Sequence, residues 1–147
     1  METVFRFSNV SVLPFWLLMI FLPRWSFTKR MMGSMWSVIL LSFAYALLML
    51  PGIPSAFGSL MNPQLGDIAS LLGRPEGATV AWLHFLAFDL FVGRWAYLDS
   101  LKKGIPPWYV SPTLFFILMF GPIGLLLYLG LARNYLTVGS ELSDGEV

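Results

Sequence analysis

The sequence contains no cysteine, only one histidine and few charged residues. Without cysteine, disulfides, zinc–thiolate sites, iron–sulfur clusters and thiol nucleophiles are all excluded. With His84 as the single histidine, we expect no metal site and no cofactor, and a lone axial ligand to haem or chlorophyll remains an alternative role for it. Charged residues make up 12% of the chain and the formal net charge is +1, which predicts no nucleic-acid partner.

Apolar residues dominate the amino-acid composition. They make up 57% of the 147 residues, aromatic residues make up 16%, and the mean hydropathy is +0.74. This composition is typical of a small integral membrane protein whose partner is the lipid bilayer. The N-terminal segment has neither the small-residue cleavage site of a signal peptide nor the composition of an organelle transit peptide. We therefore expect it to be retained as a first membrane span.

The apolar segments predict an all-α fold, a polytopic membrane protein with four transmembrane helices in an antiparallel bundle. The predicted spans are residues 10–22, 31–50, 79–100 and 109–132. Residues 1–136 form one four-helix membrane domain in this interpretation. Residues 137–147 are expected to be a disordered acidic tail.

The longest break between apolar segments, residues 51–77, is rich in proline and glycine. It predicts one short helix that is capped by Asn62, has Pro63 at its first position and ends at Gly73. Its apolar side chains lie on one side. Two roles fit this pattern: an interfacial helix lying flat on the membrane, or a lid over a cavity within it.

The basic residues predict the orientation. Five of the nine lie in the first and third loops: Arg24, Lys29, Arg30, Lys102 and Lys103. By the positive-inside rule these loops face the cytoplasm or stroma. The long second loop and both termini are then non-cytoplasmic.

Four polar residues spaced five apart interrupt the third predicted span: His84, Asp89, Arg94 and Asp99. A carboxylate near the bilayer midplane costs at least about 2.5–3.5 kcal/mol, so such residues are usually functional. On an α-helix, residues that are five apart point in directions that differ by about 140° around the helix axis. The four side chains therefore cannot all face one cleft. Asp89 is either a functional base, a partner of Arg94 in a buried ion pair, or a protonated hydrogen-bonding group. Asp99 is expected to pair with Lys102 at the interface.

The same span carries an aromatic stripe at helical spacing, made of His84, Phe88, Phe91 and Trp95. Ordinary packing or lipid contact explains such a stripe. A groove for a long, flat, apolar ligand is the functional alternative, because aromatic rings bind such ligands by area and stacking. Asp89 lies on a different face, which argues against a simple dyad of His84 and Asp89.

Opposite Asp89, the fourth predicted span contains Gly121-Pro122-Ile123-Gly124. Proline releases a backbone carbonyl and glycine permits close approach, so we expect a kink that opens a cavity. Gly121, Gly124 and Tyr128 share a face. Tyr45, His84 and Tyr128 lie at similar distances from their helix ends, so they are expected to form one polar layer.

The run HFLAFDLFVGRWAYLDS at residues 84–100, the pair Pro106–Pro107 and the segment FGPIGLLLYL are similar to the small membrane-protein family of the plant abscisic-acid-deficient-four protein. The resemblance extends from LPFWLLMIFLP to LARNYL. It implies a role in xanthophyll metabolism, since the plant members are needed to make neoxanthin from violaxanthin. The absence of a transit peptide predicts a bacterial source, with the protein in the cytoplasmic or thylakoid membrane.

The resemblance implies an isomerisation in which a 5,6-epoxide opens to a tertiary alcohol, a proton leaves C7 and an allene forms. Such a reaction needs an acid and a base but no redox cofactor. Asp89 and His84 are the candidate bases. Arg94 is the candidate for stabilising the oxyanion or holding Asp89 ionised. The candidate substrate-binding residues are Tyr45, Phe88, Phe91, Trp95, Gly121, Gly124 and Tyr128, and either tyrosine can also donate a proton.

A non-catalytic role is the alternative hypothesis. The small size and many aromatic residues also fit a carotenoid-binding or assembly subunit of a pigment–protein complex, acting as a homo-oligomer or within a larger membrane assembly. Ion or proton transport ranks third, because one midplane acid is fewer than a pathway normally needs.

Overall fold

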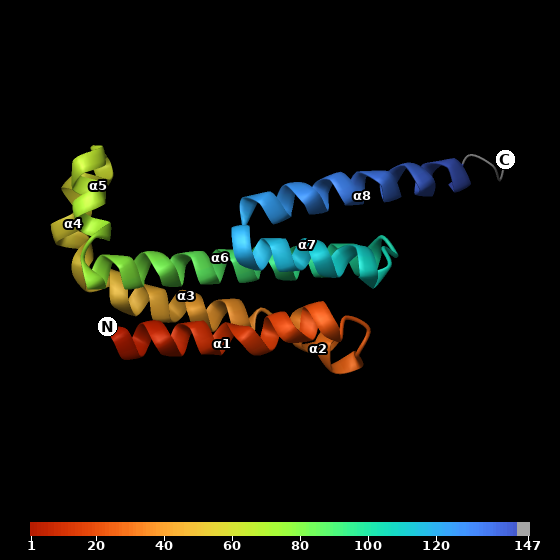
Figure 1. The fold of residues 1–147 in the computed structure, drawn as a ribbon, viewed down its shortest axis with the longest axis horizontal. Helices are drawn as coiled ribbons and strands as arrows, with labels where there is room; N and C mark the ends of the chain where they lie inside the picture. The colour runs from red at the N-terminus through yellow and green to blue at the C-terminus, as the bar shows by residue number, and fades with distance from the viewer. Residues whose placement is uncertain (144–147) are drawn as a thin grey trace. The chain divides into compact units, whose positions relative to one another are not determined.

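The computed structural model describes the backbone of residues 1–143 and all side chains within it except 55, 56, 59, 60 and 136–143. All secondary-structure elements in this part of the chain are helices, which confirms the all-α prediction (Figure 1). The elements are α1 (Glu2–Phe21), α2 (Ser26–Gly33), α3 (Trp36–Met49), the 3₁₀ turn η1 (Leu50–Gly52), α4 (Ile53–Met61), α5 (Leu65–Leu72), α6 (Pro75–Lys102), α7 (Pro107–Phe120) and α8 (Pro122–Ser143).

The helices do not follow four simple spans. Within the described residues, α1 alone is long and apolar enough by itself to cross a membrane. The predicted span 31–50 is broken between α2 and α3, and this region reaches the same length and apolarity only when both helices are counted as one broken span. Helix α6 has the length but not the apolarity, since polar and charged side chains recur along it. The four-helix bundle is therefore not established by length and composition.

Residues 51–77 contain two short helices rather than the one predicted. Asn62 ends α4 instead of capping the next helix, and α5 begins two residues after Pro63. Gly73 follows the end of α5, as predicted. The additional helix α4 has proline within its first two positions, where the missing N–H costs no intrahelical hydrogen bond. A proline that indicates a loop in the sequence therefore starts a helix here.

The predicted span 109–132 is wrong as a single helix. Helix α7 ends at Phe120, and Gly121 adopts φ +34° and ψ −89°, a conformation that favours glycine. Pro122 then starts α8, which folds back to lie beside α7 (Figure 1). A Cβ on Gly124 would lie 2.1 Å from the backbone nitrogen of Ile117, so glycine there permits the close approach of the two helices.

Helix α8 continues to Ser143. The region predicted as a disordered tail, residues 137–147, therefore has helical backbone as far as that residue. Residues 144–147 lie outside the described part of the chain.

The chain divides into two compact units, whereas the sequence predicts one domain. Residues 1–13 and 36–88 form the first unit, and residues 14–35 and 89–147 form the second. Among the described side chains of the first unit, the buried apolar residues are Val12, Val38, Leu41, Leu83, Leu86 and Ala87. Those of the second include Trp16, Met19, Met32, Leu90, Tyr97, Leu114, Ile117 and Tyr128.

Close packing and hydrogen bonds from side-chain hydroxyls to backbone carbonyls hold the second unit together. The buried Trp16 ring packs against Gly93, where a Cβ would lie 2.4 Å from its Cη2 atom. The hydroxyl of Tyr97 donates to the carbonyl of Pro23 at 2.6 Å, and that of Ser111 donates to the carbonyl of Ile20 at 2.7 Å. These contacts fix the end of α1 and its following loop against α6 and α7.

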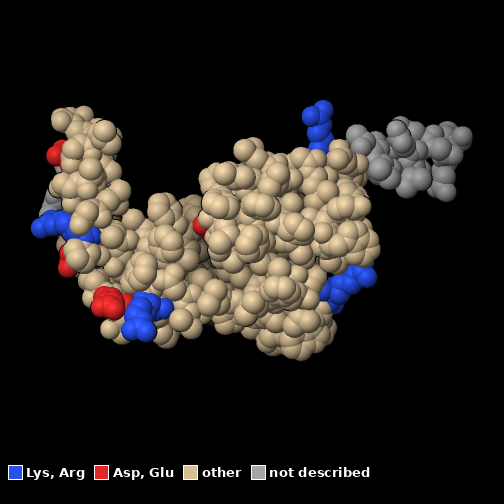
Figure 2. Space-filling view, in the orientation of Figure 1, with Lys and Arg blue, Asp and Glu red and all other residues tan. Residues whose placement is uncertain are grey.

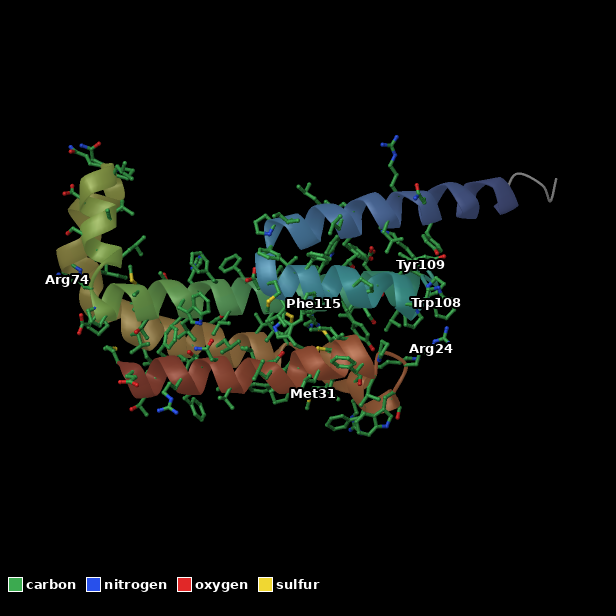
Figure 3. All side chains as sticks on the ribbon, in the orientation of Figure 1. Arg24, Met31, Arg74, Trp108, Tyr109 and Phe115 are labelled. Carbon is green, nitrogen blue, oxygen red and sulfur yellow. The ribbon has the colours of Figure 1, made fainter. Side chains whose placement is uncertain are left out.

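Charged residues are sparse on the outer surface. Uncharged residues cover most of the face in Figure 2, and many large apolar side chains are exposed, for example Phe7 at 75% and Phe21 at 71%. Trp108 and Tyr109 begin α7 and lie at the same end of the second unit as Arg24 (Figure 3). Aromatic and basic side chains together are typical of a membrane interface.

Candidate ligand-binding site

The first unit contains a cavity of about 610 Å³. Its walls come from the end of α3 with η1, from α5, and from the first three turns of α6. The apolar and aromatic part is formed by Tyr45, Leu48, Leu71, Val80, His84 and Phe85. This volume falls in the range of about 300–1,000 Å³ that is usual for sites that bind small molecules.

The only histidine of the sequence lies in the wall of this cavity. The ring of His84 stacks on Phe88, with centroids 4.6 Å apart, and packs at a tilt against Tyr45 at 5.5 Å. The structure therefore brings together Tyr45 and His84, which the sequence places at one depth. Since both residues line the cavity, a proton donor and a proton acceptor lie side by side in an aromatic setting.

One part of the cavity wall is polar, and the sequence analysis missed it. Asp67 and Ser70 of α5, Arg74 just before α6, and Glu76 in the first turn of α6 line the cavity and are exposed. The signal that could have revealed them is the group of charged residues around Pro75 within a long apolar sequence. Prediction of their shared cavity also requires the tight corner between α5 and α6.

That corner is set by Gly77. A Cβ there would lie 1.9 Å from the carbonyl oxygen of Leu71, so only glycine lets the first turn of α6 lie against α5. Helix α5 is thereby held as a wall of the cavity.

The aromatic stripe on α6 is exposed rather than packed in a core. The exposed fractions are 58% for Phe88, 42% for Phe91 and 40% for Trp95. His84 and Phe88 belong to the first unit, and Phe91 and Trp95 belong to the second. The three rings thus keep exposed surface that is free to contact lipid or an apolar ligand.

Asp89 lies beside the bend between α7 and α8. A Cβ on Gly121 would lie 2.6 Å from Oδ1 of Asp89, so the carboxylate and the bend are in direct proximity, as the depth argument predicts. Within the described residues, the Asp89 side chain has no hydrogen-bond or ion-pair partner. His84 and Asp89 belong to different units.

The predicted alternative of an ion pair between Asp89 and Arg94 is wrong. Nε of Arg94 donates to the carbonyl of Ser34 at 3.2 Å, and Nη2 donates to the carbonyl of Gly33 at 3.1 Å. Both carbonyls lie at the break after α2, where a helix end leaves acceptors outside the intrahelical pattern, and the guanidinium donates to both of them. Arg94 thus stabilises the end of α2.

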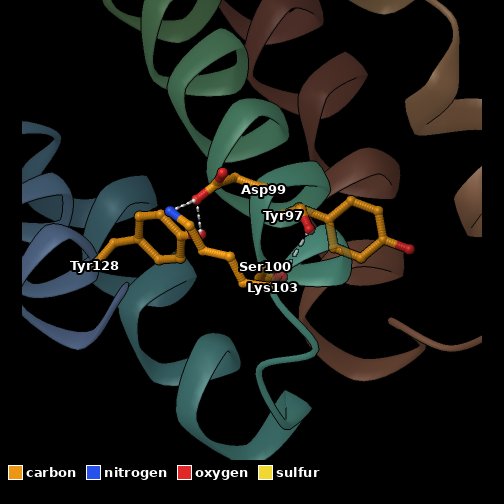
Figure 4. A network of polar contacts seen from close by, with 5 residues as sticks. All are labelled: Tyr97, Asp99, Ser100, Lys103 and Tyr128. Carbon is orange, nitrogen blue, oxygen red and sulfur yellow. Dashed lines mark hydrogen bonds and ion pairs between the residues drawn. The ribbon is translucent and has the colours of Figure 1, made fainter. Parts of the chain in front are cut away.

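A second polar cluster, also missed by the sequence analysis, surrounds Asp99 (Figure 4). Oδ2 of Asp99 accepts a hydrogen bond from the Tyr128 hydroxyl at 2.7 Å and pairs with Nζ of Lys103 at 2.6 Å. The predicted partner was Lys102, three residues along the chain, but the ion pair is made by Lys103, four residues along the chain and just after the end of α6. Tyr128 also packs edge-on against Trp95 at 5.6 Å. It therefore belongs with Asp99 and not in a layer with Tyr45 and His84.

Removing the Tyr128 hydroxyl is expected to destabilise the second unit. The side chain is fully buried, and its hydrogen bond goes to a charged group, which is typically worth about 1.5–3 kcal/mol. We predict that Tyr128→Phe lowers the free energy of unfolding by roughly this amount, measured by thermal or denaturant unfolding in detergent. Tyr109→Phe, at a tyrosine that is 51% exposed, is the matched control and should have little effect. Equal stability of Tyr128→Phe and the unmodified protein would contradict the assignment.

A model of the family described as ABA DEFICIENT 4-like matches residues 3–128, which include the cavity, Asp89 and the bend at Gly121. The chain belongs to this family. It is 31% identical over 131 residues to "Protein ABA DEFICIENT 4, chloroplastic" of Arabidopsis thaliana. The aligned region covers 85% of this chain and 58% of that relative, so the chain spans little more than half of its length. No solved structure matches the chain.

Proposed function

We propose that the protein is an integral, multi-pass membrane protein of xanthophyll metabolism that binds one end ring of a 5,6-epoxy carotenoid. Two observations support this role: the family membership, and the cavity that carries Tyr45 and His84. The cavity is the observation that carries the proposal, because it combines apolar walls for a ring with a proton donor and acceptor.

The proposed reaction is a neoxanthin-synthase-like isomerisation to an allenic alcohol. The C–O bond of the epoxide at C5 stays intact and the one at C6 breaks while the C7 proton leaves. His84 accepts that proton, and the Tyr45 hydroxyl protonates the epoxide oxygen as it becomes the tertiary alcohol. Transfer of the proton from His84 back to Tyr45 restores both side chains, so the net reaction moves one proton and no electrons. General acid–base catalysis of this kind contributes about 10²–10⁴-fold in rate.

Embedding in a bacterial cytoplasmic or thylakoid membrane accounts for the exposed apolar surface. Helix α1 has 20 residues and is apolar enough to cross a hydrocarbon layer of about 30 Å, and α6 has 28 residues with a length of about 42 Å, which exceeds that thickness. The exposed aromatic stripe of α6 then contacts lipid or the polyene chain of the ligand.

The second candidate function is carotenoid binding without catalysis, for instance as a subunit of a pigment–protein complex. The exposure of Phe88, Phe91 and Trp95 favours this alternative, because long flat ligands bind exposed aromatic rings well.

The test is to purify the protein from a host that makes 5,6-epoxy xanthophylls and to quantify bound pigment and allenic product. We expect both from the unmodified protein. Ala81→Trp fills the cavity and should lose both. Leu65→Trp, on a side chain that is 87% exposed and does not line the cavity, should keep both. Bound pigment without product supports the second candidate, and equal pigment on Ala81→Trp rules out the cavity as the site.

A further inference from the structure

The direction of α8 in the second unit follows from two of its contacts with α6. Gly121, just before α8, lies against Asp89, and Tyr128 of α8 is hydrogen-bonded to Asp99. Between these contacts the chain advances ten residues in α6, about 15 Å, and seven residues from the bend into α8, about 10 Å, in the same sense. Helix α8 therefore runs parallel to the second half of α6.

Helix α7 runs in the opposite direction. It follows α6 after a short turn at Lys103–Pro106 and ends at the bend, where Gly124 of α8 packs against Ile117. Its 14 residues have a length of about 21 Å, less than the roughly 30 Å of the hydrocarbon layer. Helix α7 is thus too short to cross a membrane and reverses before reaching the other side.

The bend lies level with the middle of α6. Asp89 lies fourteen residues after the first residue of that helix and thirteen before the last. We infer that α7 and α8 form a re-entrant hairpin that enters the membrane from the face carrying Lys102 and Lys103, turns at Gly121 near the midplane, and returns to the same face. This inference rests on the membrane embedding proposed above.

Charge and backbone chemistry agree with this topology. Arg133, exposed near the end of the described side chains of α8, returns to the face of Lys102 and Lys103, where basic residues are preferred. The Tyr97–Pro23 hydrogen bond places the loop containing Arg24 at that end too. An irregular bend is tolerated within a membrane only where protein covers it, and Gly121 is buried. The inferred topology puts the C-terminal end of α8 on the face of Lys102 and Lys103, whereas the sequence predicts the opposite face.

Labelling of single cysteines tests the hairpin directly, because the sequence contains no cysteine. Glu76→Cys and Lys102→Cys mark the two ends of α6, and Arg133→Cys marks the returning end of α8. All three positions are exposed. A membrane-impermeant maleimide is applied to sealed vesicles of each orientation. We expect Arg133→Cys to be labelled in vesicles of the orientation that labels Lys102→Cys. In vesicles of the orientation that labels Glu76→Cys, we expect no labelling of Arg133→Cys.

Labelling of Arg133→Cys together with Glu76→Cys would overturn the inference, because the chain would then cross the membrane between Lys102 and Arg133. Labelling of Glu76→Cys and Lys102→Cys from one side would overturn it as well, since α6 would not span. A fourth variant, Ile123→Cys, tests the depth of the bend: this exposed side chain should react from neither side until detergent is added. Reaction in intact vesicles would place the bend in water and reject the re-entrant hairpin. Pigment binding is measured separately, so failure of the topology and failure of the proposed function are distinguishable.

Discussion

His84→Gln is expected to lower the rate of allenic product formation by roughly 10²–10⁴-fold while leaving pigment binding almost unchanged. Glutamine keeps the polarity and much of the size of the side chain, so the cavity next to Tyr45 and Phe88 should persist. It cannot accept and return a proton as imidazole does. The rate loss therefore follows from the missing base and not from a missing contact.

Three matched variants identify the base. Tyr45→Phe removes the proposed proton donor from the same cavity. It should also lower the rate, because the variant has no tyrosine hydroxyl at this position to protonate the epoxide oxygen. Asp89→Asn removes the other candidate base, and Phe88→Leu changes the ring that stacks on His84 without removing a proton-transfer group. Product and bound pigment are quantified for each at equal protein level. Full activity of His84→Gln with loss of activity in Asp89→Asn would assign the base to Asp89 and reject the role of His84.

Helical periodicity predicted the features that depend on single helices. It placed an aromatic stripe with His84 along one long helix, and α6 carries that stripe on an exposed side. Depth comparison predicted that Tyr45 lies near His84 and that Gly121 lies near Asp89, and both contacts form. These predictions succeed because a helix advances by a constant rise per residue.

The predictions that were wrong depend on how a glycine or proline changes the direction of the chain. Gly121-Pro122 can kink a helix or reverse it, and both outcomes place the bend opposite Asp89. They differ only farther along the chain. A continuing helix would bring Tyr128 level with His84, whereas the reversal brings it to Asp99, where it is hydrogen-bonded. The sequence alone does not distinguish a kink from a reversal, because the choice depends on packing between α7 and α8.

The sequence also did not predict the partners of the charged side chains, because those partners depend on tertiary structure. Arg94 and Asp89 are near each other in sequence, but the guanidinium donates instead to the carbonyls of Gly33 and Ser34 at the break after α2. That break carries no proline and depends on packing in the second unit. The two carbonyls that accept from Arg94 lie where a helix ends, so the partner of the guanidinium is known only once that helix end is known.

Gly121→Ala is expected to be among the most destabilising single substitutions in the second unit, because two costs combine at this residue. The backbone at φ +34° and ψ −89° is strained for a residue with a side chain, at about 1–3 kcal/mol. The new Cβ would also lie 2.6 Å from the Asp89 carboxylate, so either the hairpin or the carboxylate must move. Unfolding in detergent measures the total loss.

A double-mutant cycle separates the two costs. Asp89→Ala removes the opposing carboxylate, so combining it with Gly121→Ala should recover the part of the loss due to the clash, with a coupling energy in the range of about 0.5–3 kcal/mol. Gly104→Ala is the control for backbone strain alone, since Gly104 has φ +65° with no atom within 4 Å of the added Cβ. Zero coupling with Asp89, or equal losses at Gly104 and Gly121, would show that the carboxylate does not press against the bend. A clear coupling would establish the contact between Asp89 and the α7–α8 bend on which the direction of α8 depends.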